Sequence, residues 1–209
     1  MPLTKPRTLT VSRKTIRVKS TGGAGVSAAL RTVGHGALEP GAFGALVRDA
    51  GVEVVVDVRR YPGSRRHPHF GSEAMADWLA ADFGVLYRWC PALGGRRRPV
   101  EGSPNVGLRN EQFRAYADHM ATPEFAAAAA ELRTLAARRT SAVMCAEGLW
   151  WHCHRRLLAD HLVLVEGLCV QHLFHDGRLA AHPVTPEARR EGDHLVYDAG
   201  VDHPLFDGA

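Results

Sequence analysis

Chemically active side chains are concentrated in residues 144–155, directly after the apolar run Ala142, Val143 and Met144. They are Cys145, Glu147, His152, Cys153, His154 and Arg155. The apolar run is typical of a buried strand, and apolar residues then recur at helical spacing from 157 to 165. In a parallel α/β sheet, ligands bind where a strand gives way to a helix, and the helix N-terminus attracts anions. The segment is therefore predicted to be a functional site.

Glu147 is the candidate for acid–base catalysis. A carboxylate in a partly buried crevice can act as general base, general acid or glycosyl nucleophile, and Asp57 is a candidate second carboxyl group. His35 and His154 are candidates for assisting proton transfer. The alternative interpretation is that Glu147 only forms an ion pair with an arginine.

Cys145 offers a different chemistry. A cysteine at the end of a strand, close to a helix N-terminus and to Arg155, can have a lowered pKa and attack as a thiolate. The alternative is a small buried apolar residue. The Cys-x5-Arg loop of cysteine-dependent phosphatases does not match, because position 151 is tryptophan.

A metal site in this segment is weighed but not favoured. Cys145, His152, Cys153 and His154 carry soft ligand groups. The interval between the two cysteines is longer than the Cys-x2-4-Cys spacing of structural zinc sites, and adjacent side chains rarely point at one ion. No metal ligand is therefore predicted, and the cofactor is left open.

Arginines follow the second predicted strand and indicate an anionic substrate. The planar guanidinium group suits the recognition of phosphate or carboxylate. The candidates for substrate binding are Arg59, Arg60, Arg65, Arg66 and Arg155. Residues 96–98 add a run of arginines in a loop near the same edge, where solvated loop charge is the alternative. The predicted partner is a nucleotide, DNA or RNA.

The elements that must position these residues alternate between strand and helix. The predicted strands cover 30–33, 52–58, 85–89, 141–145 and 168–174, and the predicted helices cover 40–50, 72–83, 110–120, 123–138 and 151–166. This alternation predicts an α/β fold with a mostly parallel sheet flanked by helices. Because the carboxyl ends of parallel strands share one edge, His35, Arg59 and Glu147 are expected in one crevice.

The chain of 209 residues is expected to form one domain. Residues 1–29 are predicted to be a basic, disordered tail, 30–175 the α/β domain, and 176–209 a C-terminal extension that lies on the core or is disordered. Residues 1–20 contain six Lys and Arg and no Asp or Glu, whereas the whole chain carries a net charge of only +4. The pI of about 9.1 therefore reflects the tail and is weak support for a basic nucleic-acid-binding domain.

The composition argues against a membrane protein, because the apolar runs are far shorter than the roughly 20 residues of a spanning helix. The N-terminus lacks the apolar segment of a secretory signal. Four cysteines without a disulfide-scaffold pattern fit a reducing compartment. A cytoplasmic location without a membrane partner is expected.

Several ordered motifs between about residues 30 and 175 carry a family resemblance. They are T-V-G-H-G (32–36), D-V-R-R-Y-P-G-S-R-R-H-P-H-F (57–70), L-G-G-R-R (93–97), F-R-A-Y-A-D-H-M (113–120), M-C-A-E (144–147), C-H-R-R-L-L-A-D (153–160) and V-Q-H-L (170–173). In these motifs the chain resembles the bacterial proteins grouped as domain of unknown function 488. The resemblance implies an α/β fold but no particular reaction.

The same resemblance marks a set of site positions, which are His35, Asp57, Arg59, Cys145, Glu147, Cys153, His154 and Arg155. Gly36 departs from the serine expected after Gly-His, so a hydroxyl has no predicted role there.

Together these observations predict a hydrolase that acts on a phosphate-bearing nucleotide or nucleic acid. Arg59, Arg60 and Arg155 would hold phosphate, and Glu147 would serve as acid/base or nucleophile. N-glycosidic cleavage is slightly favoured, because phosphodiester cleavage usually requires a metal. One alternative is a rhodanese-like or redox enzyme that uses Cys145. The other is a non-catalytic nucleic-acid-binding module.

Overall fold

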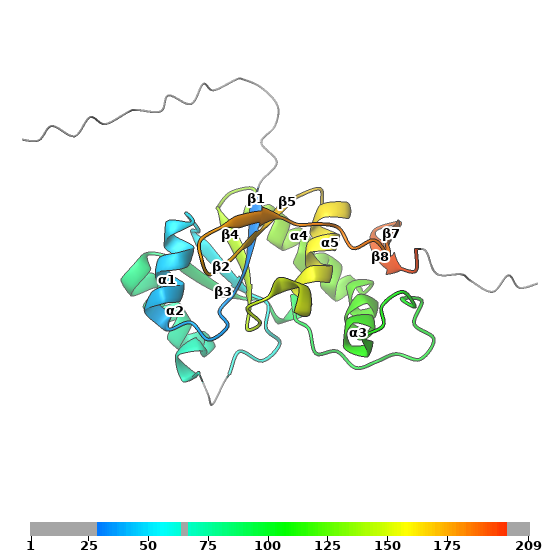
Figure 1. Cartoon of the computed structure of the whole chain (residues 1–209), viewed down its shortest axis with the longest axis horizontal. Helices are drawn as coiled ribbons and strands as arrows, with labels where there is room; N and C mark the ends of the chain where they lie inside the picture. The colour runs from blue at the N-terminus through cyan, green and yellow to red at the C-terminus, as the bar shows by residue number, and fades with distance from the viewer. Residues whose placement is uncertain (1–28, 64–66, 200–209) are drawn as a thin grey trace, which may run out of the picture.

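The computed structural model describes residues 29–63 and 67–199 (Figure 1). The predicted tail of residues 1–29 lies outside the described residues, apart from Ala29 at the start of the first strand. In the described part of the chain, no helix is both long enough and apolar enough to cross a membrane.

A six-stranded sheet forms the centre of the molecule, with the strand order β3-β2-β4-β1-β5-β6. Its strands are β1 (Ala29–Gly34), β2 (Val54–Asp57), β3 (Leu86–Trp89), β4 (Ser141–Cys145), β5 (Cys169–Leu173) and β6 (Leu179–Ala181). Strands β1 to β5 pair in parallel, and β6 joins β5 antiparallel. The predicted α/β fold with a mostly parallel sheet is confirmed.

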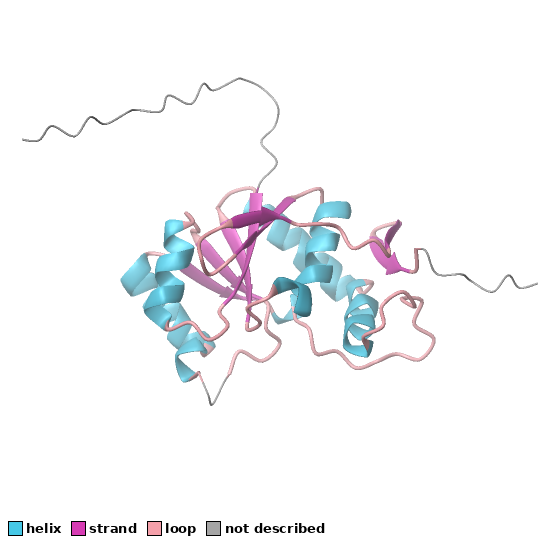
Figure 2. Cartoon of the chain, in the orientation of Figure 1, coloured by secondary structure: helices cyan, strands magenta, loops and turns pink. Residues whose placement is uncertain are grey.

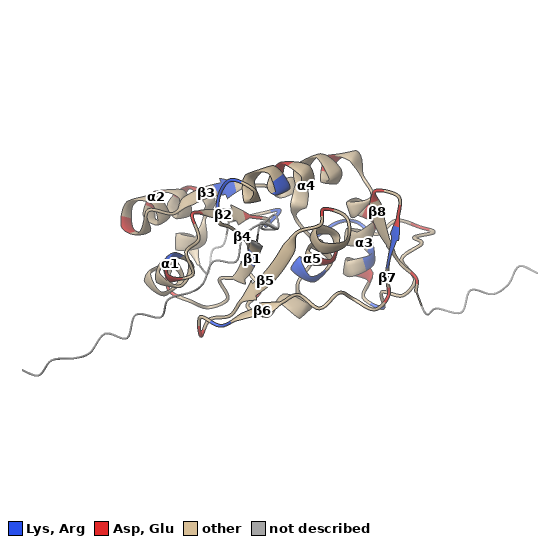
Figure 3. Cartoon of the chain, turned by 90° about the horizontal axis from the view of Figure 1, so that it is seen from above, with Lys and Arg blue, Asp and Glu red and all other residues tan. Residues whose placement is uncertain are grey.

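Five α-helices cover the two faces of this sheet (Figure 2). They are α1 (Pro40–Asp49), α2 (Ser72–Phe83), α3 (Glu111–Met120), α4 (Pro123–Ala136) and α5 (Arg155–Leu164). Seen from above, α1 and α2 lie on one side of the strands, and α3, α4 and α5 lie on the other (Figure 3). The same view shows the positions of basic residues (blue) and acidic residues (red) interspersed along the described ribbon.

Each face of the sheet has its own apolar core, because side chains alternate along a strand. In β4, Ala142 and Met144 belong to the core under α1 and α2, whereas Val143 and Cys145 belong to the core under α3, α4 and α5. All residues of β2 and β4 are buried, as expected for strands covered on both sides. This alternation decides on which side of the sheet each functional side chain lies.

The helix α5 is shorter than the predicted helix 151–166, and the difference matters for the site. Residues Trp150–His152 form a 3-10 turn, and Cys153 is extended with φ −121° and ψ 151°. The α-helix begins only at Arg155, with His154 as its N-cap residue. Cys153 and His154 therefore lie in the junction between loop and helix rather than on a helix face.

The described part of the C-terminal extension packs on the core rather than remaining disordered. Besides the edge strand β6, it forms a hairpin of β7 (Ala188–Glu191) and β8 (His194–Tyr197). Leu195 and Tyr197 of β8 are buried in the core under α3, α4 and α5. These strands are too short to leave a clear periodicity in the sequence, which is why they were not predicted.

A buried chain of polar groups connects this extension to α5 and to the centre of the sheet. Thr32 donates from its hydroxyl to Nδ1 of His172 (2.6 Å), His172 Nε2 to His182 Nδ1 (3.0 Å), and His182 Nε2 to Asp160 (2.8 Å). This direction is the one that satisfies every group when both histidines are neutral. Burial, followed by the neighbouring His182, lowers the pKa of His172 to about 3, so its ring is neutral at neutral pH.

Asp160 is the last acceptor of this series of hydrogen bonds. It also accepts from the Thr185 backbone N–H (2.8 Å) and the Tyr197 hydroxyl (3.1 Å).

We predict that Asp160→Ala lowers the free energy of unfolding by about 3 kcal/mol or more, because each buried donor left unpaired costs about 1–3 kcal/mol. Asp160→Asn keeps an acceptor oxygen for His182 and Thr185, so its loss should be at most about 1 kcal/mol. Urea denaturation measures both values, and equal losses in the two variants would contradict the anchoring role.

Candidate active site at the carboxyl edge of the sheet

The order in which successive strands are added to the sheet reverses between the neighbouring parallel strands β1 and β4. From the carboxyl end of β1 it continues towards β2 and β3, and from that of β4 it continues the opposite way, towards β5. Ligands of open α/β sheets bind outside the carboxyl ends of the strands at such a point. The loop that follows β4 contains Glu147 and leads to the cluster predicted from the sequence.

A cavity of about 410 Å³ opens at this edge, on the side of α3 and α5. Its lining combines cations, aromatic rings, a carboxylate and sulfur atoms. The lining residues are Arg59, Arg60, Tyr61, Gly95, Arg96, Asn110, Gln112, Phe113, Tyr116, Cys145, Ala146, Glu147, His152, Cys153 and His154. The volume lies within the range of small-molecule sites. Of the predicted site residues, the cavity brings together Arg59, Arg60, Cys145, Glu147 and His154.

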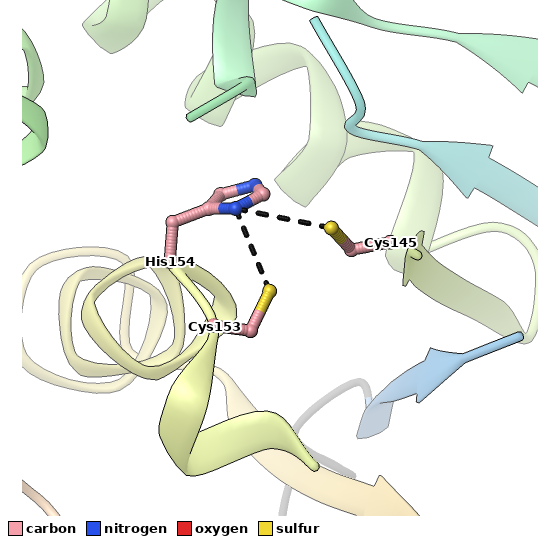
Figure 4. Close-up of side chains that lie close together, drawn as sticks. All are labelled: Cys145, Cys153 and His154. Atoms are coloured by element: carbon pink, nitrogen blue, oxygen red, sulfur yellow. Dashed lines mark hydrogen bonds between the residues drawn. The ribbon is translucent and has the colours of Figure 1, made fainter. Parts of the chain in front are cut away.

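Two cysteines and a histidine converge at the wall of this cavity (Figure 4). Cys145 comes from the end of β4, and Cys153 and His154 precede α5. Nδ1 of His154 lies 3.9 Å from the sulfur of Cys145 and 3.5 Å from that of Cys153. Both cysteines are buried, and the three ligand atoms lie within 4.8 Å of one another. The adjacent side chains of Cys153 and His154 thus point to one spot, contrary to the expectation from sequence.

The pKa values of the two thiols are shifted in opposite directions. The hydrogen bond with Cys153, and then burial, raises the pKa of Cys145 well above its ordinary value. Burial also raises the pKa of Cys153, but the hydrogen bond from Cys145 and the charges of His154 and Arg155 outweigh it, so that this pKa lies well below its ordinary value. Thiolate character therefore belongs to Cys153, and Cys145 is the protonated partner.

Arg155 does not line the cavity, which corrects its predicted role in substrate binding. Its side chain is only 1% exposed, and Nη2 donates to the backbone carbonyl of Glu147. A Cβ atom at Gly34 would overlap that same carbonyl oxygen, so only glycine allows the loop after β4 to lie this close to β1. Arg155 is thus a positioning residue that fixes the backbone of the loop that carries Glu147.

His35 and Asp57 do not line the cavity either, because their side chains lie in the buried layer next to α2. Asp57 accepts from Arg59 Nε (2.9 Å) and from the Tyr87 hydroxyl (2.7 Å). The His35 ring stacks on Phe70 with centroids 4.1 Å apart, and burial, followed by the charge of Arg59, lowers its pKa to about 4. The roles of second carboxylate and proton donor predicted for these two residues have no geometric support.

The arginines divide into structural and cavity-facing groups. The guanidinium of Arg59 is committed to Asp57 and to the carbonyl of Phe70 (2.7 Å), and Arg97 similarly holds loop carbonyls, including that of Gly94 (2.9 Å). Arg60 and Arg96 line the cavity and have no carboxylate partner among the described residues. The predicted ligands Arg65 and Arg66 lie outside the described residues. Arg60 and Arg96 are therefore the cavity-lining arginines whose charge is not paired with a described carboxylate.

Glu147 is exposed at the cavity, and no described residue binds its carboxylate. The alternative of an ion pair with arginine is therefore not observed in the described part of the chain. The carboxylate is free to accept or deliver a proton to a molecule in the cavity.

Helix α3 supplies cavity residues that the sequence did not reveal as functional. Phe113 and Tyr116 line the cavity, and the Tyr116 ring packs edge-on against His154 with centroids 5.0 Å apart. The Tyr116 hydroxyl donates to the carbonyl of Leu93 (2.9 Å), which ties α3 to the long loop after β3. Phe113 and Tyr116 lie in the motif 113–120 that resembles the family, but no local pattern places them in a cavity. Their helix begins after the N-cap Asn110, which accepts from the N–H groups of Gln112 and Phe113.

A comparison with known protein families gives one family for this chain. A family model described as Domain of unknown function DUF488 matches residues 40–162, more than half of the chain. The chain belongs to the DUF488 family. The match includes β4, the loop with Glu147 and the whole Cys145, Cys153 and His154 cluster. No curated protein and no solved structure matches the chain.

The close approach of β1 to the loop after β4 in this DUF488 domain leads to a test. We predict that Gly34→Ala lowers the free energy of unfolding by about 1–3 kcal/mol, because a buried methyl group must displace the Glu147 backbone. Gly41→Ala is the control, since a Cβ there meets nothing within 4 Å and replacing glycine in a helix is neutral or stabilising. Thermal or urea unfolding measures both; equal stability of the two variants would contradict the described contact.

Proposed function

We propose that this DUF488 protein is a hydrolase acting on a phosphate-bearing nucleotide or nucleic acid, with Glu147 as the acid/base. The observation that carries the proposal is the unpartnered carboxylate of Glu147 in a cavity that Arg60 and Arg96 also line. The two guanidinium groups supply donors for phosphate oxygens. The carboxylate supplies the group that exchanges a proton with the reacting bond.

The aromatic and amide residues of the same cavity support a nucleotide as the ligand. Tyr61 and Phe113 offer ring faces on which a base can stack. Asn110 and Gln112 offer amide donors and acceptors for the edge of a base. A simple phosphate ester would leave most of these groups unused.

The geometry removes the reason for preferring N-glycosidic cleavage over other hydrolytic reactions. The preference for N-glycosidic cleavage depended on a pair of carboxylates, and the buried, hydrogen-bonded Asp57 is not available as the second one. Hydrolysis with a single carboxylate requires a second group, either to help activate water or to protonate the leaving group. The proposal is therefore hydrolysis of a nucleotide or nucleic acid without a preference for the glycosidic bond.

The rhodanese-like or redox alternative relies on Cys145, whose side chain is buried. A nucleophilic cysteine needs thiolate character and access. The pKa of Cys145 is raised by its hydrogen bond with Cys153 and by burial, so this thiol remains protonated at neutral pH.

The proposal is tested by a screen of the wild-type chain against nucleosides, nucleotides, and damaged or modified DNA and RNA. We predict that Glu147→Gln reduces any turnover by roughly 100-fold or more, because it keeps the shape but cannot exchange a proton. Binding of the substrate should survive this change. Glu101→Gln is the matched control: Glu101 is exposed in the loop before α3 and does not line the cavity.

Turnover that is unaffected by Glu147→Gln would overturn the proposed role of this residue. The absence of turnover across the panel, together with binding of nucleic acid, would favour a non-catalytic binding module.

A further inference from the structure

We propose that Cys145, Cys153 and His154 bind a zinc ion, with the fourth coordination position open to the cavity. The inference rests first on the three side chains themselves. Thiolate and imidazole are the ligands that zinc prefers, and two cysteines with one histidine is a ligand set known from catalytic zinc sites. The set belongs to two separate chain segments, the end of β4 and the start of α5, which the fold brings together.

The distances between the ligand atoms match those of a tetrahedral zinc site. With Zn–S near 2.3 Å and Zn–N near 2.0 Å, a tetrahedron places sulfur and nitrogen about 3.6 Å apart and the two sulfurs about 3.8 Å apart. Nδ1 of His154 is 3.5 Å from Cys153 and 3.9 Å from Cys145, and all three atoms lie within 4.8 Å. An ion therefore requires only small side-chain adjustments.

The surroundings favour a bound metal ion in two ways. The two sulfur atoms are buried, so water competes weakly for the ion. The Tyr116 ring and the backbone of Gly95 confine the imidazole of His154, since a Cβ at Gly95 would lie 2.9 Å from Nδ1.

Three protein ligands leave one position of the tetrahedron unfilled, and all three of these residues line the cavity. A zinc ion with an open position lowers the pKa of its bound water to about 7, which is the activation that a single-carboxylate hydrolase lacks. Glu147, which also lines the cavity, is then placed as the group that takes the proton. This use of the ion rests on the proposed function, whereas binding of the ion does not.

The binding claim is tested on the full chain after reduction and removal of metal by a chelator. Titration with Co²⁺ as the probe should give the thiolate-to-cobalt charge-transfer band and the visible bands of a tetrahedral site, at one ion per chain. Zinc should displace the cobalt and abolish these bands. Cys145→Ser and Cys153→Ser should each weaken zinc binding by about 100-fold or more, since they remove a ligand.

Cys90→Ser and Cys169→Ser are matched controls, because these two cysteines lie outside the cluster. They should leave the cobalt spectrum and the zinc affinity unchanged. Circular dichroism of each metal-free variant checks that it is folded, and His154→Gln provides a second ligand substitution if a serine variant is not. A second readout is alkylation: zinc should protect Cys145 and Cys153 from iodoacetamide but not Cys169.

The absence of tetrahedral cobalt bands in the reduced wild-type chain would overturn the site. So would equal zinc affinity in the Cys145→Ser and Cys169→Ser variants. One ion per chain without hydrolytic turnover would retain the zinc site and reject the proposed function. Turnover by the metal-free chain would instead retain the hydrolase and reject the role of zinc in it.

Discussion

The buried guanidinium of Arg155 connects the first turn of α5 to the backbone of the loop after β4. It donates to the carbonyl of Glu147 directly beside Gly34, where no side chain fits. A buried cation is costly unless its charge is compensated, and no described carboxylate forms an ion pair with Arg155. The hydrogen bond to the Glu147 carbonyl satisfies one donor of this guanidinium, and its charge adds a minor contribution to the lowered pKa of Cys153 after those of Cys145 and His154. The hydrogen bond of Arg155 thus fixes the loop that carries Glu147.

A second buried cluster stabilises the neighbouring strand end, and its member Arg59 also lines the cavity. Asp57, Arg59 and Tyr87 form hydrogen bonds among themselves, with His35 neutral beside them. Their place follows from the alternation along β2, since Asp57 points to the opposite face of the sheet from Val56 and Val58. The two sets of polar residues therefore share an edge of the sheet but have separate functions, one in structure and one in the cavity.

The sequence predicted the strands and helices well wherever an apolar run or a helical period was long. It also predicted the edge at which Cys145 and Glu147 lie, because strand ends in a parallel sheet share an edge. It did not predict on which face each side chain lies, so that Asp57 and His35 were grouped with Glu147. Tyr116 and Phe113 line the cavity because of the way α3 packs. This packing is a long-range contact, and the local sequence gives no signal of it.

The convergence of Cys153 and His154 also escaped prediction, because it depends on the extended backbone of Cys153 just before α5. A continuous helix from 151, as predicted, would have directed the two side chains apart. The 3-10 turn and the late start of α5 turn adjacent residues toward one point. Trp150 of this 3-10 turn packs on His172 of β5, with stacked rings 4.0 Å apart, which is a long-range contact that the local sequence does not reveal.

Binding of a phosphate-bearing ligand in the cavity at the carboxyl edge of β4 can be observed in a crystal structure of the full chain with a nucleoside monophosphate. We expect the phosphate within hydrogen-bond distance of Arg60 or Arg96 and the base against Tyr61 or Phe113. An ordered nucleotide outside this cavity, or an empty cavity at saturating nucleotide, would contradict it.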